Sequence, residues 1–456
     1  MKKYTVKGLL QNDGWKSNVE LTVDHQGIIQ QIEENYAQSS GEKINGYALP
    51  GFQNAHSHAF QYAMAGLAEV HDVSHTSDDF WSWREAMYAL ALTVNPEQME
   101  AIATMLYAEM VRHGYTHVAE FHYVHHGKNG QPYSNLAEMG SRLVSAAKTA
   151  GINITLVPIF YQKGGFGKDP VVGQRRFISP TIDAYLKLLE ASEKACVTYS
   201  GANLGIGIHS MRGVEPTAIA EIAKSGPQDL PFHIHIAEQI KEIEDSVAYL
   251  GKRPVEWLLD NVELNERFHL VHATHLTSDE TSDIAKSGVN VVICPTTEGN
   301  LGDGLFPLIE YQQQGGAWSI GTDSHISLNP LEELRLLDYG QRLISHNRDT
   351  FAKQHGDSGL FAIEMATIAG RKAMNNFSKL FFEVGAPFNA SIVDAASPLL
   401  GTCSPKNLTS SILYTADASH QWGTIVNGEI KSKGRPANYE TILENFNATI
   451  RTLKNR

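Results

Sequence analysis

The feature that most constrains how this chain folds is a repeated alternation of strand-like and helix-like segments through its middle. Short apolar runs alternate with longer segments whose apolar residues recur every three to four positions. Counting the run that ends at His56, eight such units fill roughly 300 residues, which is typical of a (β/α)8 barrel of the TIM type. A doubly wound parallel sheet is the rival architecture, but its first strand would more often lead into a glycine-rich phosphate turn. Here that turn carries His56 and His58 instead.

The two ends of the chain follow a different pattern. Residues 3–33 alternate apolar and polar positions between turn residues. Beyond Pro387 strand-like patterns return, at 391–393, 412–414 and 424–426. An amphipathic helix is expected over 439–453. We therefore expect a small β-sandwich domain built from both chain ends. The expected boundaries are 1–48 plus 386–456 for this domain and 49–385 for the barrel.

Composition limits the partners and the compartment. The 456 residues carry a formal net charge of −13, which argues against nucleic acid and anionic membranes as partners but allows a small anionic substrate. The first residues lack the apolar run of a signal peptide, and no stretch approaches the ~18 apolar residues of a membrane span. Three cysteines are too few for a disulfide framework, as expected in a reducing compartment. We expect a cytoplasmic protein and a homodimer.

Polar side chains gather at the predicted C-terminal ends of the barrel strands, where such barrels carry their functional groups. His56 and His58 point to the same side of an extended strand and can reach one ion together. The other candidates at strand ends are His209, His235, His272 and Asp323. Each residue alone is as well explained by a hydrogen bond inside the barrel, but together they predict nitrogen and oxygen ligation of a metal ion. His233 also points inward by the i, i+2 rule and is the alternative to His235.

These motifs resemble the amidohydrolase superfamily, and in particular its deaminase branch. The resemblance covers almost the whole chain, and it rests on the motif from Pro50 to His58, on the pair His235 and Glu238, and on His272 and Asp323. It implies one divalent metal ion, expected to be zinc, held by His56, His58, His235 and Asp323. Binuclear members use a carboxylated lysine at the end of the fourth strand, where this chain has Gly207, Ile208 and His209.

Three closer stretches narrow the resemblance to the formimidoylglutamate deiminase family. They are 208–212, 235–239 and 294–304, of which the last discriminates best. The resemblance implies a hydrolase that acts on a C–N bond of a linear amidine. Members of that family convert N-formimino-L-glutamate into N-formyl-L-glutamate and ammonia in histidine degradation.

The resemblance also suggests a role for each polar residue. His272 and Asp323 are expected to orient the attacking water and accept its proton, and Glu238 to deliver a proton to the departing nitrogen. The substrate carries two carboxylates, which suit arginine. The residues expected to bind it are Gln61, Arg84, Tyr123, His209 and Arg212. The structural alternatives are a solvated position at a helix start for Glu238, stacking on Trp81 or Trp83 for Arg84, and an ion pair for Arg212.

Two other functions stay open on the sequence alone. One is a related deaminase acting on an aromatic, nucleobase-type ring, which a mouth lined mainly by aromatic side chains would favour. The other is a barrel without activity that serves as a scaffold or binding protein, but it would need neither the ligand set nor Glu238 and His272. We interpret the glycine-rich stretch 164–167 as a mobile loop. We interpret three further histidines as loop residues rather than a second metal site: His122, His125 and His126.

Overall fold

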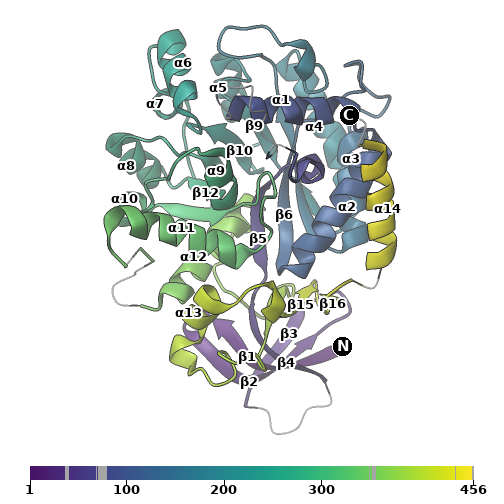
Figure 1. The fold of residues 1–456 in the computed structure, drawn as a ribbon, viewed down its shortest axis with the longest axis vertical. Helices are drawn as coiled ribbons and strands as arrows, with labels where there is room; N and C mark the ends of the chain where they lie inside the picture. The colour runs from purple at the N-terminus through teal and green to yellow at the C-terminus, as the bar shows by residue number, and fades with distance from the viewer. Residues whose placement is uncertain are drawn as a thin grey trace.

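The computed structural model describes residues 1–35, 41–67, 69, 80–348, 350–351, 356–436 and 438–453. Within these residues the chain forms a parallel barrel and, below it in Figure 1, a smaller sheet made from both ends of the chain. The barrel confirms the predicted (β/α)8 class. The second sheet confirms that the two chain ends combine into one small β domain.

Among the described residues, eight parallel strands form the barrel, in the sheet order β13-β12-β11-β10-β9-β7-β6-β5. Their bounds are β5 (Phe52–Ser57), β6 (Tyr115–His122), β7 (Asn153–Phe160), β9 (Ile206–Ser210), β10 (Phe232–Ile236), β11 (Phe268–His272), β12 (Asn290–Ile293) and β13 (Ala317–Ile320). A short strand, β8 (Ala202–Leu204), pairs with β7 outside this ring. The ring closes between β5 and the end of β13, where the amides of Thr322 and Asp323 donate to the His56 carbonyl at 3.1 and 3.0 Å. This closure brings the backbones of His56 and Asp323 together.

The barrel strands are apolar because both of their faces are covered. Every residue of β7 is buried, as is every residue of β10 and β11. Parallel strands buried on both faces have continuous apolar runs rather than alternating patterns. Several buried polar residues lie at the strand ends or one residue before them: His56 in β5, His235 in β10 and His272 in β11. Because a buried polar group is costly without a partner, these positions serve more than packing.

Helices surround the barrel and connect its strands (Figure 1). Their bounds are α1 (Phe80–Thr93), α2 (Pro96–Arg112), α3 (Glu138–Ala150), α4 (Ile182–Cys196), α5 (Pro216–Ser225), α6 (Ile240–Leu250), α7 (Pro254–Asn261), α8 (Ser278–Ser287), α9 (Pro295–Leu301), α10 (Leu308–Gln313), α11 (Pro330–Ser345) and α12 (Ser358–Ala373). Three 3-10 turns lie at Ala59–Met64, Val172–Gln174 and Ala418–His420. Asn95 begins α2 with a capping box, accepting from the Gln98 amide, and Pro96 fills the first turn.

The small sheet joins strands from the two chain ends in the order β16-β15-β14-β4-β1-β2-β3. Their bounds are β1 (Lys2–Gln11), β2 (Gly14–Val23), β3 (Ile29–Glu34), β4 (Glu42–Pro50), β14 (Ala390–Asp394), β15 (Gln421–Val426) and β16 (Glu429–Ser432). We propose the domain boundaries 1–48 plus 386–456 and 49–385 on this sheet membership. The last helix, α14 (Tyr439–Leu453), lies along α2 of the barrel (Figure 1).

The strand expected at 412–414 is wrong. These residues belong to a helix, α13 (Pro405–Thr415), whose buried side chains are Leu408, Thr409, Ile412 and Leu413. Their spacing of three and four residues places them on one helical face. A three-residue apolar run does not distinguish a strand from one turn of such a helix.

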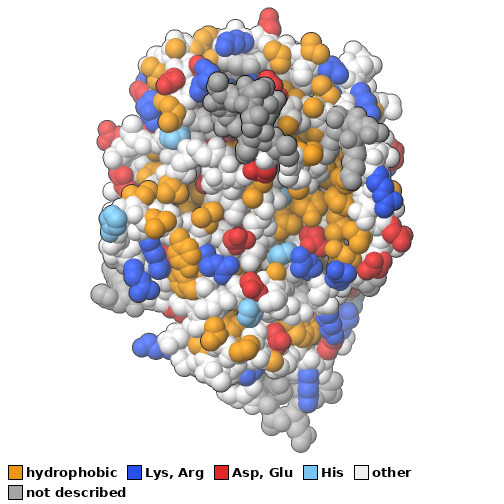
Figure 2. All heavy atoms as spheres, viewed as in Figure 1, with side chains coloured by type: hydrophobic (Ala, Val, Ile, Leu, Met, Phe, Trp, Pro, Cys, Tyr) orange, Lys and Arg blue, Asp and Glu red, His pale blue; other side chains and the backbone are white. Residues whose placement is uncertain are grey.

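The surface and the cysteines agree with the composition. On the face drawn in Figure 2, Lys and Arg side chains lie interspersed with Asp and Glu. Cys196, Cys294 and Cys403 are free thiols. In the part of the chain that the structure describes, no helix has the length and apolar character needed to cross a membrane.

Candidate active site

Three histidines and one aspartate converge at the C-terminal end of the barrel. The Nε2 atom of His56 lies 3.1 Å from that of His58 and 3.0 Å from that of His235. The Asp323 Oδ1 atom lies 3.5 Å from His56 Nε2 and 3.3 Å from His58 Nε2. All four side chains are buried. Donor atoms from three strand ends therefore gather around His56 Nε2, and we call these four residues the His/Asp cluster.

Two rings of the His/Asp cluster are oriented from behind by backbone carbonyls. Nδ1 of His58 donates to the Phe121 carbonyl at 2.8 Å, and Nδ1 of His235 donates to the His209 carbonyl at 2.9 Å. A neutral imidazole carries one N–H, so donation from Nδ1 leaves the lone pair on Nε2. Hydrogen bonds of this kind are the usual support of histidines that bind a metal ion.

The donor set fits a divalent metal ion. Burial lowers the pKa of His56 to about 3 and also lowers the pKa of His58 and His235, which keeps the rings neutral. Burial works to raise the pKa of Asp323, but the neighbouring histidines outweigh it and hold that pKa below its ordinary value. Tetrahedral zinc with bonds of ~2.1 Å would separate its ligands by about 3.4 Å. Four of the six donor pairs lie 3.0 to 3.5 Å apart, close to this separation, and His235 forms a second candidate group with His56 and His272.

His233, the alternative to His235, lies on the same strand but deeper in the barrel. Its Nε2 atom is 3.2 Å from the Ala373 carbonyl at the end of α12. Its ring lies against that of His269, with the centroids 4.7 Å apart. Neither contact involves the His/Asp cluster, so His235 and not His233 is the member that β10 contributes.

His272 and Glu238 lie beside the His/Asp cluster. The His272 Nε2 atom is 3.8 Å from Glu238 Oε1 and 3.8 Å from Asp323 Oδ2, while its Nδ1 atom is 3.2 Å from Glu298 Oε1. Burial works to lower the pKa of His272, but the surrounding carboxylates outweigh it and raise the pKa to about 10. A divalent ion held by Asp323 would oppose this rise and favour the neutral ring. Glu238 is buried, which does not fit a solvated residue at a helix start.

The backbone is strained where these strands end. Ala237, His272 and Asp323 have φ angles of 54°, 69° and 44°, in the left-handed region that residues other than glycine rarely adopt. Such strain persists only where the surrounding structure enforces it, and it concentrates at functional sites. Here the strained residues lie at or just after the ends of β10, β11 and β13, where the polar residues also lie.

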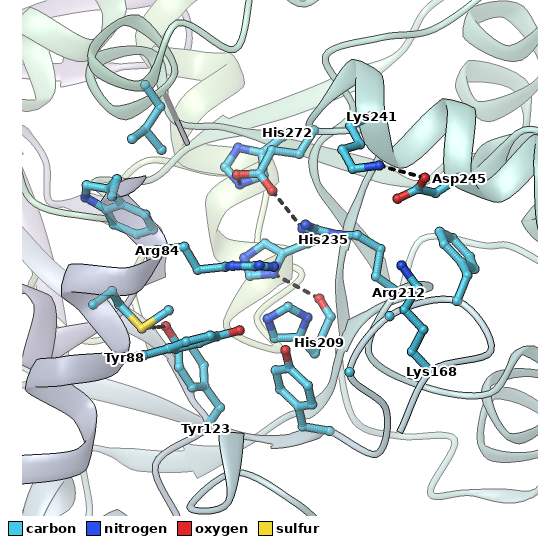
Figure 3. Close-up of a pocket in the computed structure, with 18 of the residues that line it drawn as sticks. Arg84, Tyr88, Tyr123, Lys168, His209, Arg212, His235, Lys241, Asp245 and His272 are labelled. Carbon is cyan, nitrogen blue, oxygen red and sulfur yellow. Dashed lines mark hydrogen bonds and ion pairs between the residues drawn. The ribbon is translucent and has the colours of Figure 1, made fainter. Parts of the chain in front are cut away.

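A pocket of about 450 Å³ opens onto the His/Asp cluster (Figure 3). Its outer wall comes from α1, from the 161–168 segment after β7 and from α6. All the predicted substrate-binding residues line it: Gln61, Arg84, Tyr123, His209 and Arg212. Arg84 and Arg212 enter the pocket from opposite sides in Figure 3. The structure therefore brings the predicted ligands, proton carriers and substrate-binding residues into one cavity.

Neutral polar groups line the pocket together with the two arginines. Gln61 Nε2 donates to the Tyr123 hydroxyl at 2.9 Å. The His209 ring lies 4.1 Å from the Tyr161 ring. Burial raises the pKa of Tyr123 and lowers the pKa of His209, so both side chains are uncharged. Arg84 lies over the Tyr88 ring at 5.5 Å. The alternative for Arg84 is stacking on Trp81 or Trp83. The Trp81 side chain lies outside the described residues, and Trp83 lines the same pocket as Arg84.

Arg212 is part of the pocket wall and also of an ion-pair network. Its terminal nitrogen lies 3.2 Å from Glu238 Oε2, and its Nε lies 3.9 Å from Glu242 Oε2. Glu242 is fully buried on α6 and accepts a hydrogen bond from the Glu238 amide at 3.2 Å. Arg212 thus lines the pocket, as the predicted substrate-binding role requires, and also forms ion pairs, as the structural alternative requires.

The other histidines noted in the sequence lie near the second strand. His125 Nε2 is 2.9 Å from the Ile159 carbonyl, and His126 Nε2 is 2.8 Å from the Ile178 carbonyl. These backbone contacts support the interpretation of His125 and His126 as loop residues. For His122 the interpretation is wrong, because this residue is the last of β6. The glycine-rich stretch 164–167 forms a tight turn at the pocket wall, with the Gly164 amide donating to the Lys168 carbonyl at 3.0 Å. Its mobility stays a prediction.

Residues 47–431 match the model of the amidohydrolase family. The chain belongs to the amidohydrolase family. One relative, the formimidoylglutamate deiminase of Pseudomonas aeruginosa, is 47% identical over 338 residues, which cover 74% of each chain. Another, a 5-methylthioadenosine/S-adenosylhomocysteine deaminase of Halobacterium salinarum, is 26% identical over 391 residues, which cover 85% of this chain and 81% of that one.

Solved amidohydrolase structures share the architecture. An amidohydrolase from Brucella melitensis matches with a TM-score of 0.93 at 37% identity, over 99% of this chain and all of that one. An adenosine deaminase from Xanthomonas campestris with bound zinc matches in fold, with a TM-score of 0.82 at 19% identity, over 99% and 98%. Amidohydrolases typically bind a divalent metal ion, and the His/Asp cluster offers this amidohydrolase a donor group for one.

Sequence reasoning missed three residues that line the amidohydrolase pocket, Tyr88, Tyr161 and Lys168, and two buried carboxylates that contact lining residues, Glu242 and Glu298. Two of them had a detectable signal. Glu242 follows Glu238 by one helical turn, and Glu298 lies inside the 294–304 stretch that discriminates best. Tyr88, Tyr161 and Lys168 lie on a helix and a loop segment whose placement over the barrel no sequence periodicity predicts.

Proposed function

We propose that this chain hydrolyses N-formimino-L-glutamate to N-formyl-L-glutamate and ammonia, the deimination step of histidine degradation. The observation that carries the proposal is that Arg84 and Arg212 line the same 450 Å³ pocket as the His/Asp cluster. A pocket with two guanidinium groups and a hydrolytic centre suits a diacid with a linear amidine. The formimidoylglutamate deiminase of Pseudomonas aeruginosa supports the same substrate.

In this proposal the His/Asp cluster holds one divalent ion, zinc. His56, His58 and His235 supply nitrogen and Asp323 supplies oxygen, a set that suits zinc and leaves room for water. A single ion is favoured because the fourth barrel strand, β9, ends with His209 and Ser210 and carries no lysine. When bound, such an ion lowers the pKa of a water molecule toward neutrality and so supplies a nucleophile at pH 7.

The proton transfers are assigned to residues of the chain. His272 and Asp323, 3.8 Å apart, orient the attacking water and take its proton. Addition of the water oxygen to the formimino carbon gives a tetrahedral intermediate. Glu238, whose carboxylate is 3.8 Å from His272, passes a proton to the leaving nitrogen. The C–N bond then breaks, ammonia leaves, and the carbon remains as the formyl group of the product.

The substrate carboxylates are assigned to the pocket wall. Arg212 lies beside Glu238, so a carboxylate bound there would hold the substrate next to the proton carrier. Arg84, from α1 on the opposite side, and Tyr123 would bind the other carboxylate. Gln61 and His209 lie nearer the His/Asp cluster and would contact the polar head. The side-chain oxygen of Gln61 is buried with no hydrogen-bond partner in the described structure, which fits a ligand contact.

A second candidate is a deaminase that acts on an aromatic, nucleobase-type ring. The observation that favours it is the aromatic part of the pocket lining, which includes Trp83, Tyr88, Tyr123, Tyr161, Phe166 and Tyr249. The 5-methylthioadenosine/S-adenosylhomocysteine deaminase of Halobacterium salinarum also fits this reading. The two arginines favour the diacid. A scaffold without activity is disfavoured, because it needs no buried donor cluster.

Compartment and assembly belong to the same proposal. Three free thiols fit a reducing, cytoplasmic environment. A homodimer is supported by exposed apolar residues on one face of α11, namely Leu336, Tyr339 and Leu343. Light scattering of the purified protein checks this: a monomeric mass would refute the dimer.

Ammonia release tests the function. The metal-loaded enzyme is assayed in parallel with N-formimino-L-glutamate, guanine, cytosine and adenosine. We expect kcat/KM for the formimino diacid to exceed the others by orders of magnitude. Faster release from any of the three rings would replace the first candidate with the second.

A further inference from the structure

Glu298 is a buried carboxylate behind the pocket that none of the roles assigned so far uses. It lies on α9, directly after β12, and its side chain is almost fully buried. Its Oε1 atom accepts from the Cys294 amide at 2.9 Å and lies 3.2 Å from His272 Nδ1. A carboxylate removed from water needs such charged or polar partners. The contact with His272 connects Glu298 to the reacting side of the pocket, where Glu238 and Asp323 lie.

His272 lies between Glu298 and that reacting side. Its Nδ1 edge meets Glu298, whereas its Nε2 edge meets Glu238 and Asp323, each at 3.8 Å. The two edges of one imidazole therefore face different partners. An ionised carboxylate accepts hydrogen bonds but cannot donate, so Nδ1 must carry the proton in this contact. In the neutral ring this leaves Nε2 as the acceptor.

The backbone does not hold His272 in this position by itself. Its φ angle of 69° is one that a histidine rarely adopts, and the next residue, Ala273, also has a positive φ. The Ala273 amide donates to the Ile236 carbonyl at 3.0 Å, which fixes the chain but not the ring. The ring orientation depends on side-chain partners, and Glu298 is the partner on the Nδ1 edge.

The 294–304 stretch also reaches the loop that carries Glu238. The Asp303 amide donates to the Glu298 carbonyl at 3.0 Å, and the Asp303 carboxylate accepts from the side-chain amide of Gln239. Gln239 directly follows Glu238. The 294–304 stretch thus contacts His272 through Glu298 and contacts Gln239, the neighbour of Glu238, through Asp303.

We propose that Glu298 is a positioning residue that keeps the proton of His272 on Nδ1 and turns Nε2 toward Glu238 and Asp323. The hydrogen bond follows from the geometry alone. Its effect on turnover rests on the proposed function, in which Nε2 takes part in handling the water proton. The 294–304 stretch then does more than pack. Glu298 orients the ring of His272, and Asp303 contacts the loop that carries Glu238.

Proton NMR of the zinc-loaded enzyme labelled with ¹⁵N-histidine tests the positioning directly. We expect a ring N–H resonance well downfield of the amide region, absent in His272→Asn, whose ¹⁵N couplings assign the proton to Nδ1. In Glu298→Gln the charge-assisted bond becomes a weaker neutral one, so this resonance should move upfield. On formiminoglutamate, kcat should fall about 10- to 100-fold while KM and zinc content stay close to wild type.

Glu333→Gln is the matched control. Glu333 is also a fully buried carboxylate that holds α9, accepting from the Thr296 amide at 3.0 Å and from its hydroxyl at 2.6 Å. Within the described structure no hydrogen bond or ion pair joins Glu333 to His272, so the downfield resonance should stay in place in this variant. An equal change in both variants would mean that Glu298 only stabilises α9.

Three results would overturn the proposal. One is a His272 ring with its proton on Nε2 and none on Nδ1 in the wild-type enzyme. This measurement does not depend on any variant folding. The second is an unchanged resonance in Glu298→Gln. The third is a second bound metal ion lost in Glu298→Gln, because ligand atoms of His272, Cys294 and Glu298 also lie within 4.8 Å of one another. An enzyme that keeps the expected resonance but releases no ammonia from formiminoglutamate would refute the proposed function and leave the positioning intact.

Discussion

The floor and the wall of the pocket are built in different ways. The floor is the His/Asp cluster, whose residues end or directly follow barrel strands and are held by the hydrogen-bonded sheet. The wall comes from α1, the 161–168 segment and α6, which lie outside that sheet. Parallel strands of one barrel end at one mouth, so their topology alone brings distant residues together. The wall has no such constraint and depends on loop geometry.

This difference separates the part of the pocket built on the shared barrel fold from the part that sets the choice of substrate. The adenosine deaminase from Xanthomonas campestris, whose name gives another substrate, has the same fold. Arg84 and Arg212, the charged groups that we propose distinguish a diacid from a ring, lie in the wall. Changes in the floor should therefore abolish turnover of any substrate, and changes in the wall should discriminate among substrates.

The largest effect is expected when the two histidines of β10 are compared. His235→Ala removes a cluster nitrogen, so bound metal and nearly all turnover should be lost. His233→Ala removes a ring that contacts the Ala373 carbonyl and should keep metal and most turnover. Elemental analysis and ammonia release check both variants. Full metal retention in His235→Ala would contradict the assignment of the floor.

A smaller loss is expected at the junction of floor and wall. Glu238→Gln keeps the shape of the side chain and removes the proton carrier, so turnover should fall ~10²- to 10⁴-fold with metal content unchanged. Single-turnover rates with formiminoglutamate measure the chemical step. Near-normal turnover with metal bound would show that Glu238 is not the carrier.

In the wall, Arg212→Met should discriminate between substrates. Losing one partner of a desolvated charge pair costs ~2–5 kcal/mol, or roughly 30- to several-thousand-fold in kcat/KM for formiminoglutamate. A formimino compound that lacks one carboxylate should lose much less. The variant should also unfold at a lower temperature, because Glu242 stays buried without its ion-pair partner.

Two outcomes would revise this assignment. An equal loss on both substrates would reduce Arg212 to its ion pairs with Glu238 and Glu242. No loss on either would remove it from the site and favour the aromatic-ring substrate.

The smallest effect is expected at the exposed rim. Lys168 lines the pocket from the glycine-rich turn but is exposed to solvent. Exposed charges contribute about 0.2–1 kcal/mol, so Lys168→Met should raise KM for the diacid about 1.4- to 5-fold, with kcat unchanged. The difference should shrink at high salt, because screening weakens the attraction. A large loss of kcat would mean that the rim takes part in the chemistry.

The floor was predictable from the sequence and most of the wall was not. His56, His58, His235 and Asp323 each follow or end a clear apolar run, and strand order then fixes where they meet. Lys168 and Tyr161 follow such a run too, but loop residues have no periodicity that gives their direction. The error at Ile412 arose because a short apolar run lacked its context, a helix that begins after Ser404. Glu298 was missed because α9, with Thr296, Thr297 and Gly299, has weak helix-forming residues.

We propose that one metal ion in the His/Asp cluster supports deimination of formiminoglutamate. The most direct measurement removes the metal with a chelator and returns zinc in sub-stoichiometric steps while ammonia release from N-formimino-L-glutamate is followed. The rate should rise linearly and stop rising at one zinc ion per chain. A plateau at two ions per chain, or no ammonia at any amount of zinc, would contradict the account.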